Sequence, residues 1–164
     1  MKKHIKSNII LTFLVIIPLF SMFTGYVLNE DLSTGGAMWD FNLTWPIIIN
    51  YSNFNFITDI TRHMPLHYVL LSIINKIFNN KDLVKIIYLF FSFLLPILLF
   101  LNLSKIYNYK KYILIIFSSS FLFFPLFRAS AIWPNAHLTA SIFFLIGNYF
   151  YLKSKERDIF IYKI

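Results

Sequence analysis

The chain has 164 residues, of which 58% are hydrophobic and only 13% are charged. Soluble globular domains carry about 25% charged residues, so the composition argues against an ordinary soluble domain. Cysteine is absent, which excludes disulfide bonds and thiolate metal sites. The abundance of Phe, Ile, Asn, Lys and Tyr beside only 4 Gly indicates a coding bias towards A and T, and we expect a bacterial source.

Four apolar segments predict an all-α integral membrane protein with about four transmembrane helices. The first segment, 8–28, has 21 residues, which as a helix would span about 31 Å and match a bilayer core. It is longer than the apolar part of a signal peptide and no A-x-A-like cleavage site follows it, so we expect it to be retained. The other expected spans are 83–103, 112–127 and 133–152.

The basic residues predict the orientation of these spans. Ten of the 15 Lys and Arg residues lie on one side of the predicted membrane, and the other five lie on the opposite side with most of the acidic residues. The positive-inside rule therefore places both termini in the cytoplasm, here across a bacterial inner membrane. The net charge of +8 is explained by this topology, and no nucleic-acid partner is expected. The ten residues are Lys2, Lys3, Lys6, Lys105, Lys110, Lys111, Lys153, Lys155, Arg157 and Lys163.

The segment 29–82 is expected to form a long outer loop that contains a short amphipathic helix. Pro65 suits the first position of a helix, where its missing N–H costs no hydrogen bond. Apolar residues then recur at helical spacing up to residue 78. A helix over 65–78 is too short to span a membrane, so we expect it to lie in the membrane interface. Its predicted apolar face holds Leu66, Val69, Leu70, Ile73, Ile74 and Ile77, and its polar face holds Ser72, Asn75, Lys76 and Asn79.

Charged residues on the outer side are the candidates for chemistry. Asp40 follows a pair of glycines and can deprotonate a hydroxyl or hold a metal ion, with a solvated loop acid or a helix cap as the alternative. Arg62 and His63 can bind a phosphate, or contact lipid headgroups. Arg128 lies at the outer end of the third span against the positive-inside trend, which makes it a candidate anion ligand or another headgroup contact. His67 is expected to be structural.

Other polar residues have structural interpretations. Glu30 and Asp31 are expected to be charges at the level of the headgroups. In the fourth span His137, Ser141 and Asn148 fall on one helical face, which predicts hydrogen bonds between helices in the bundle interior. The sequence contains no nucleophile–base pair, Gly-rich phosphate loop or metal-ligand spacing, so it requires no metal.

Three segments resemble a known family. The run H-M-P-L-H-Y-V-L-L at 63–71 resembles the HPPLYYLLL segment of GT-C-type membrane glycosyltransferases, which include protein O-mannosyltransferases and lipid A aminoarabinose transferases. In that family the segment opens an interfacial helix in the first outer loop. The run G-G-A-M-W-D-F at 35–41 resembles the family's acidic loop position, and R-A-S-A-I-W-P-N-A-H-L at 128–138 resembles its arginine and helix start. Met64 replaces the first proline, and Phe41 stands where many members have a second acidic residue.

The resemblance implies that a sugar moves from a polyprenyl-phosphate donor to an acceptor on the extracytoplasmic face, with inversion. Arg62, His63 and Arg128 would stabilise the donor phosphate, and Asp40 would be the base. A divalent metal is compatible with this chemistry. Members of the family are much longer, so we expect 1–164 to be a single membrane domain at the N-terminal end of a longer chain. The alternative is a non-enzymatic membrane protein, such as a scaffold or a subunit of a lipid-linked sugar flippase or transporter.

Overall fold

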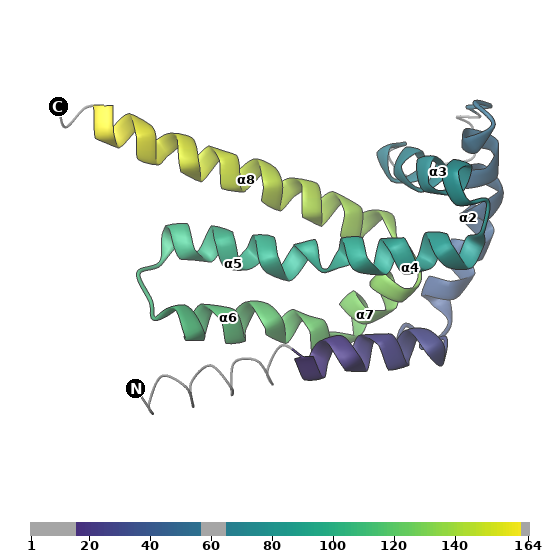
Figure 1. The fold of residues 1–164 in the computed structure, drawn as a ribbon, viewed down its shortest axis with the longest axis horizontal. Helices are drawn as coiled ribbons and strands as arrows, with labels where there is room; N and C mark the ends of the chain where they lie inside the picture. The colour runs from purple at the N-terminus through teal and green to yellow at the C-terminus, as the bar shows by residue number, and fades with distance from the viewer. Residues whose placement is uncertain (1–15, 57–64, 162–164) are drawn as a thin grey trace.

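The computed structural model describes residues 16–56 and 65–161, with side chains up to residue 155, and every regular element within these ranges is a helix (Figure 1). The all-α class predicted from the sequence is therefore confirmed for the described residues. The first described helix is Ile16–Val27. It is followed by α2 (Gly36–Ser52), α3 (Leu66–Phe78), α4 (Lys81–Ser92), α5 (Leu94–Ile106), α6 (Lys111–Ser119), the 3-10 helix η1 (Ser120–Phe123), α7 (Pro125–Ile132) and α8 (Ala136–Ile161).

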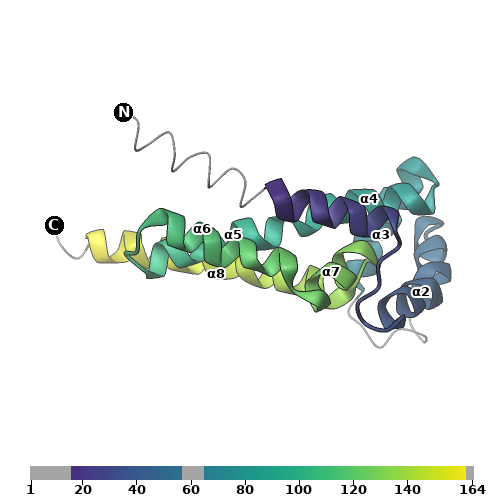
Figure 2. The same cartoon turned by 90° about the horizontal axis from the view of Figure 1, so that it is seen from below.

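The long helices lie side by side, and α2 lies across one end of them (Figures 1 and 2). The chain runs towards the α2 end in Ile16–Val27, away from it in α4 and α5, back in α6, and away again in α8. α5 packs between α6 and α8, while α2 packs against α3 and α7. This arrangement puts α2 and α3 at one end, and the α5–α6 connection at the other.

Among the described residues, one helix is long and apolar enough to cross a membrane. It is Lys81–Ile106, which joins α4 and α5 into 26 residues with a mean hydropathy of 2.5 over its most apolar part. It contains the whole of the expected span 83–103. α6 with η1 and α7 would make a second such helix only if they are taken together.

The expected third span, 112–127, is not one straight helix, because the chain bends by 65° between η1 and α7. Phe124 is extended (φ −67°, ψ 122°), as is usual for a residue that precedes proline. Pro125 then begins α7, where it has no N–H to donate. The next helix also differs from the expected 133–152, because Trp133 is extended and α8 begins at Ala136.

The helix predicted over 65–78 is present as α3, but only half of the polar face assigned to it is open, because Lys76 and Asn79 are exposed while Ser72 and Asn75 are not. Ser72 and Asn75 are buried against α2, so their placement on an exposed face was wrong. The Asn75 side chain donates to Ser52 Oγ at 3.1 Å, and Ser52 Oγ donates to the Ser72 carbonyl at 3.2 Å. Because α2 supplies these polar partners, Ser72 and Asn75 turn inward. The residues of α3 that face outward include Leu66, Ile73 and Ile77.

Buried polar side chains connect α3, α4 and α8. The Tyr88 hydroxyl donates to the Asn135 carbonyl at 2.7 Å and lies 2.9 Å from Thr139 Oγ1. That oxygen lies 2.8 Å from His67 Nδ1. All three side chains are buried, so His67 has the structural position expected of it.

A second set of amides joins α5 to α8. The Asn102 amide donates to the Leu145 carbonyl at 3.0 Å, and the Asn148 amide donates to Asn102 Oδ1 at 2.8 Å. The predicted interhelical bond is therefore confirmed for Asn148. His137 and Ser141 are exposed instead, and the predicted inward position is wrong for them.

Candidate functional site

The described charged residues that are expected on the outer side gather at the end of the molecule where α2, α3 and α7 lie (Figure 1). Asp40 lies in α2, Lys81 and Lys85 begin α4, and Arg128 lies in α7. Five of the lysines expected on the inner side lie at the opposite end, near the α5–α6 connection or in the far half of α8. The two groups of charges are thus separated by the length of the bundle.

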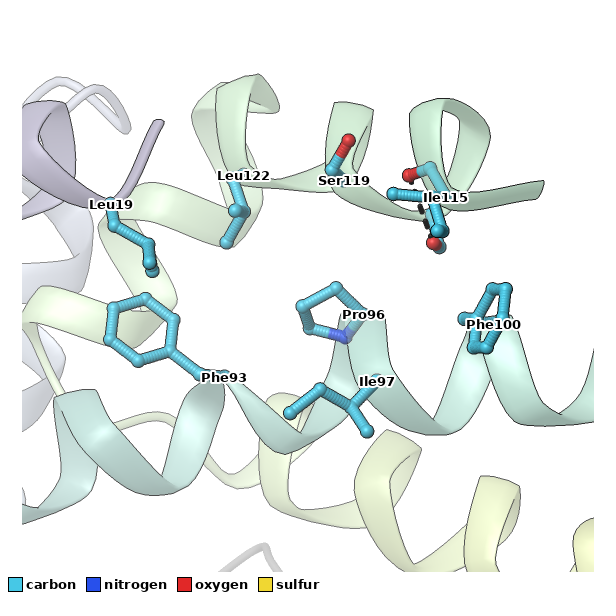
Figure 3. Close-up of a pocket in the computed structure, with 9 residues that line it drawn as sticks. Leu19, Phe93, Pro96, Ile97, Phe100, Ile115, Ser119 and Leu122 are labelled. Carbon is cyan, nitrogen blue, oxygen red and sulfur yellow. Dashed lines mark hydrogen bonds between the residues drawn. The ribbon is translucent and has the colours of Figure 1, made fainter. Parts of the chain in front are cut away.

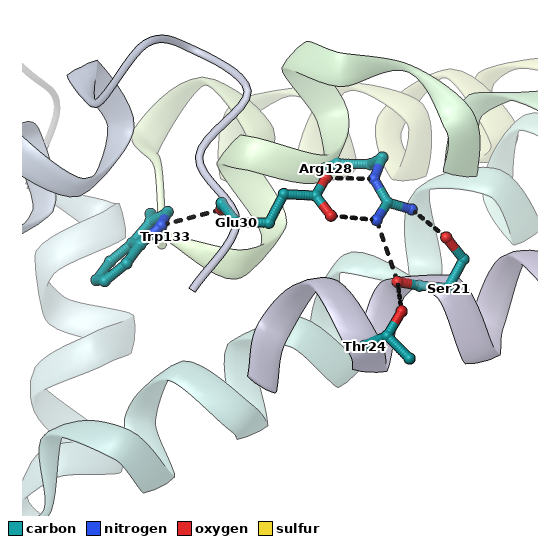
Figure 4. A network of polar contacts seen from close by, with 5 residues as sticks. All are labelled: Ser21, Thr24, Glu30, Arg128 and Trp133. Atoms are coloured by element: carbon teal, nitrogen blue, oxygen red, sulfur yellow. Dashed lines mark hydrogen bonds and ion pairs between the residues drawn. The ribbon is translucent and has the colours of Figure 1, made fainter. Parts of the chain in front are cut away.

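Arg128 forms an ion pair with Glu30 (Figure 4). Its Nε donates to Oε1 at 2.7 Å, and its Nη2 donates to Oε2 at 2.6 Å. Nη1 donates to Ser21 Oγ at 3.0 Å, and Nη2 also donates to the Ser21 carbonyl at 3.1 Å. Four of the five N–H groups of the guanidinium are therefore occupied. Glu30 is not a free charge at the headgroup level, and that interpretation was wrong.

The ion pair depends on a small residue in the first described helix. An added Cβ at Gly25 would lie 2.5 Å from Glu30 Oε2 and 2.9 Å from Arg128 Nη2, so a side chain there would push against both partners. Hydrogen bonds from Arg128 hold the pKa of Glu30 below its ordinary value, and they outweigh the opposite effect of partial burial. The Glu30 carbonyl accepts a hydrogen bond from the Trp133 indole at 3.2 Å. Gly25 and these bonds fix the chain just before α2.

Asp31 fixes the start of α2. Its carboxylate accepts hydrogen bonds from the backbone N–H of Ser33 at 3.0 Å and of Met38 at 2.7 Å, and from the Ser33 hydroxyl. Burial raises the pKa of Asp31, but these bonds outweigh it and the pKa is lowered overall. Gly35, at φ 89°, then lets the chain turn into the helix. Asp31 was expected to be a plain headgroup-level charge, and this was wrong because it orders the loop in front of Asp40.

Asp40 is exposed on α2, while its neighbour Phe41 is buried. The Phe41 ring lies 6.1 Å from the Trp133 ring, which places α2 against the residue that follows α7. The Lys85 ammonium lies over the Trp133 ring, with Nζ 3.6 Å from the ring centroid, in a cation–π contact. Phe41 therefore anchors α2 so that Asp40 points outward. Of the predicted site residues, the structure describes Asp40 and Arg128, while Arg62 and His63 lie outside the described residues.

An apolar cleft of about 330 Å³ lies between α5 and α6 (Figure 3). Its two serines, Ser118 and Ser119, donate to carbonyls of their own helix at 2.8 and 3.1 Å, so they offer no free donor to a ligand. The remaining walls are Leu19, Phe93, Pro96, Ile97, Phe100, Ile115 and Leu122. Only an apolar group, such as a hydrocarbon chain, fits this lining.

Within residues 16–56 and 65–155, no three His, Asp or Glu side chains come close enough together to hold a metal ion. The described part of the site consists instead of an exposed carboxylate on α2 and a partly buried ion pair between the loop before α2 and α7. No family model matches the chain, and no curated protein and no solved structure is significantly similar to it.

Proposed function

We propose that this chain is the N-terminal membrane part of a GT-C-type glycosyltransferase. In this proposal a sugar moves from a polyprenyl-phosphate donor to an acceptor on the extracytoplasmic face, with inversion. The observation that carries the proposal is the position of α2 and α3. Both lie at the end of the bundle that holds Glu30, Asp31 and Asp82, as the resemblance implies for the first outer loop, and α2 presents Asp40 outward.

The distribution of apolar side chains supports a membrane location. Only 39% of the most apolar part of Lys81–Ile106 is buried, whereas the core helix of a soluble protein is mostly buried. Large exposed apolar surfaces mark contacts with a partner or a membrane, because they are costly in water. α3 adds an outward apolar stripe suited to the membrane interface. Exposed apolar residues outside α3 include Phe20, Val27, Phe90, Ile97, Phe124, Leu126, Phe144 and Phe150.

The separation of charges supports the orientation, with both termini in the cytoplasm of a bacterium. Lys105, Lys110 and Lys111 lie around the α5–α6 connection, and Lys153 and Lys155 lie in the same direction along α8. Cytoplasmic loops carry such an excess of lysine. Asp40 and Arg128 then belong to the extracytoplasmic end, where a lipid-linked sugar would be used.

The mechanism assigns residues to the two sides of the anomeric carbon, the side that is attacked and the side from which the phosphate leaves. The Asp40 carboxylate takes the proton of the acceptor hydroxyl as the hydroxyl oxygen attacks the anomeric carbon. The bond from that carbon to the donor phosphate breaks, and the phosphate leaves with the electron pair. Arg62 and His63 stabilise the charge on the leaving phosphate. Attack opposite the leaving group inverts the anomeric carbon.

Arg128 takes part in this proposal through an exchange of partners. A phosphate can accept the same pair of parallel hydrogen bonds that the Glu30 carboxylate accepts. Donor phosphate would therefore bind Arg128 by displacing Glu30, which occupies Nε and Nη2. The apolar cleft between α5 and α6 would take part of the polyprenyl chain.

The occupied state of Arg128 also favours a second candidate, a non-enzymatic membrane scaffold or transporter subunit. In that case the ion pair only joins the first described helix, the loop before α2, and α7. The two candidates differ in what they require of Asp40, because a scaffold needs no base there.

The test is transfer from a polyprenyl-phosphate-linked sugar by the intact protein in detergent. Asp40→Asn keeps the size of the side chain and removes the base, so transfer should fall at least about a hundredfold while donor binding stays nearly the same. Asp82→Asn is the matched control, because it removes an exposed acid at the same end of the molecule and should leave transfer unchanged. Full activity in Asp40→Asn would contradict the proposed mechanism.

A further inference from the structure

A polar groove of about 590 Å³ lies between α2 and α3, beside the start of α4. It differs in chemistry from the cleft between α5 and α6, which is apolar. Its lining combines two lysines, three amides and an indole, and none of the described residues that line it is acidic. The polar lining and the indole come from Trp45 and Asn53 on one side, and from Asn75, Lys76, Asn79 and Lys81 on the other.

The two ammonium groups of the groove have neutral partners. Lys81 Nζ donates to Asn42 Oδ1 at 2.6 Å and lies 5.3 Å from the centroid of the Trp45 ring. Lys76 Nζ lies 3.6 Å over the Phe54 ring. An ammonium has three N–H donors, and a neutral partner does not balance its charge. Asp82 acts electrostatically on Lys81 and balances its charge in part, but Asp82 does not line the groove. The groove therefore attracts an anion.

The walls of the groove are ordered before any ligand arrives. Asn75 is bonded to Ser52 across the α2–α3 interface at 3.1 Å. Asn79 ends α3 in the left-handed conformation, and its N–H donates to the Asn75 carbonyl at 2.7 Å. Within the described residues, no hydrogen bond engages the side-chain amides of Asn53 and Asn79. These two amides are left to bind hydroxyl groups of a ligand.

We propose that this groove binds a sugar or polyol that carries a phosphate. Lys76 and Lys81 take the phosphate, the amides of Asn53 and Asn79 take hydroxyl groups, and the Trp45 indole contacts the C–H face of the ring. The volume is in the range of small-molecule sites, about 300–1,000 Å³, and exceeds what inorganic phosphate needs. The binding does not depend on the proposed transferase activity, because Asp40 does not line the groove.

The experiment measures the binding of glucose 1-phosphate, glucose and inorganic phosphate to the intact protein in phosphatidylcholine nanodiscs. Glucose 1-phosphate should bind more tightly than either of the other two. The double variant Lys76→Gln/Lys81→Gln should weaken this binding at least about tenfold, since hydrogen bonds to charged groups are lost. Lys111→Gln is the matched control, because it removes an exposed lysine from the opposite end of the bundle and should change nothing.

Lys81 also bonds to Asn42, so the single variant Lys76→Gln keeps the test valid if the double variant does not fold. Equal binding of glucose and glucose 1-phosphate, or unchanged binding in Lys76→Gln, would overturn the proposal. A further arm identifies the source of the phosphate. If nanodiscs that contain phosphatidylglycerol weaken the binding of glucose 1-phosphate, the groove holds lipid headgroups. If they do not, it holds a soluble sugar phosphate.

Discussion

Arg128 and Glu30 bind each other through two parallel hydrogen bonds of 2.7 and 2.6 Å, across 98 positions of the sequence. The Arg128 side chain is 8% exposed and the Glu30 side chain is 22% exposed. Removing one partner of a fully buried ion pair costs about 3–5 kcal/mol, and the cost here should be smaller because Glu30 is only partly buried. The pair therefore joins three segments of the chain at the end where Asp40 lies.

The first prediction separates an exchangeable Arg128 from a purely structural one. Glu30→Gln weakens the hydrogen bonds to the Arg128 guanidinium. The affinity for a polyprenyl-phosphate donor should therefore rise, while the free energy of unfolding falls. Arg128→Ala should lose both donor affinity and stability. Donor binding and chemical denaturation, measured on the same detergent preparations, check this. An unchanged donor affinity in Glu30→Gln would assign Arg128 to structure alone.

The second prediction concerns the glycine behind the ion pair. Gly25→Ala should destabilise the protein by about 1–3 kcal/mol, because the new methyl group crowds Glu30 Oε2 and Arg128 Nη2. Gly147→Ala in α8 is the control, since an added Cβ there meets nothing within 4 Å. Alanine favours helix by about 1 kcal/mol over glycine, so this control should be neutral or stabilising. Thermal unfolding of both variants would show the opposite signs.

The third prediction follows from the lowered pKa of Glu30. A carboxylate whose pKa is lower in the folded state contributes stability that is complete above its ordinary pKa of 4.5 and is lost as the pH falls through the folded-state value. The stability difference between wild type and Glu30→Gln should therefore be largest near pH 7 and shrink on acidification below about pH 4.5. Urea midpoints measured from pH 7 to pH 3 test this. A difference that is constant with pH would show that Glu30 is not ionised in the pair.

The fourth prediction uses the two faces of α3. Ser72→Asp should destabilise the protein in detergent by about 3 kcal/mol, because the new charge is buried against α2. Ile77→Asp lies on the outward face, so it should leave stability in detergent nearly unchanged but weaken the contact of α3 with the bilayer surface. Unfolding in detergent measures the first effect, and quenching of a fluorophore on α3 by lipid-attached quenchers in liposomes measures the second. Equal destabilisation by both substitutions would contradict the orientation of α3.

The fifth prediction concerns topology. The chain has no cysteine, so single cysteines can be labelled without background. Asn55→Cys should react with a membrane-impermeant maleimide in intact cells, while Ser154→Cys should react only after permeabilisation. Both side chains are exposed, so access within the protein does not limit labelling. Labelling of both from outside would contradict the proposed orientation.

Local patterns in the sequence predicted much of the helical structure. Helical spacing of apolar residues from Leu66 up to residue 78 located α3, which ends at Phe78. The bend before Pro125 could also have been predicted, because a residue before proline favours an extended conformation. It was not predicted, because the apolar run 112–127 was interpreted as one continuous helix. These features depend on residues that are close together in the chain.

Contacts between distant segments were not predictable in the same way. Nothing near Glu30 in the sequence indicates a partner 98 positions away, so it was assigned to the headgroups. Ser72 and Asn75 were placed outside by a rule that fits helices in water. Here α2 offers polar partners, and the apolar stripe turns outward. The sequence of a helix shows where its polar and apolar stripes lie, but the neighbouring helix determines which of the two stripes is buried.

The hydrogen bonds between Asn102 and the residues of α8 also constrain the order in which the molecule can be completed. A ribosome makes the chain from its N-terminus, so the Asn102 amide acquires these partners only after Leu145 and Asn148 have been added. Until then α5 can slide or rotate against α6 alone. Once the amides engage, a shift of α8 by one residue breaks both bonds, so the alignment of the two helices is set only after residue 148 has been added.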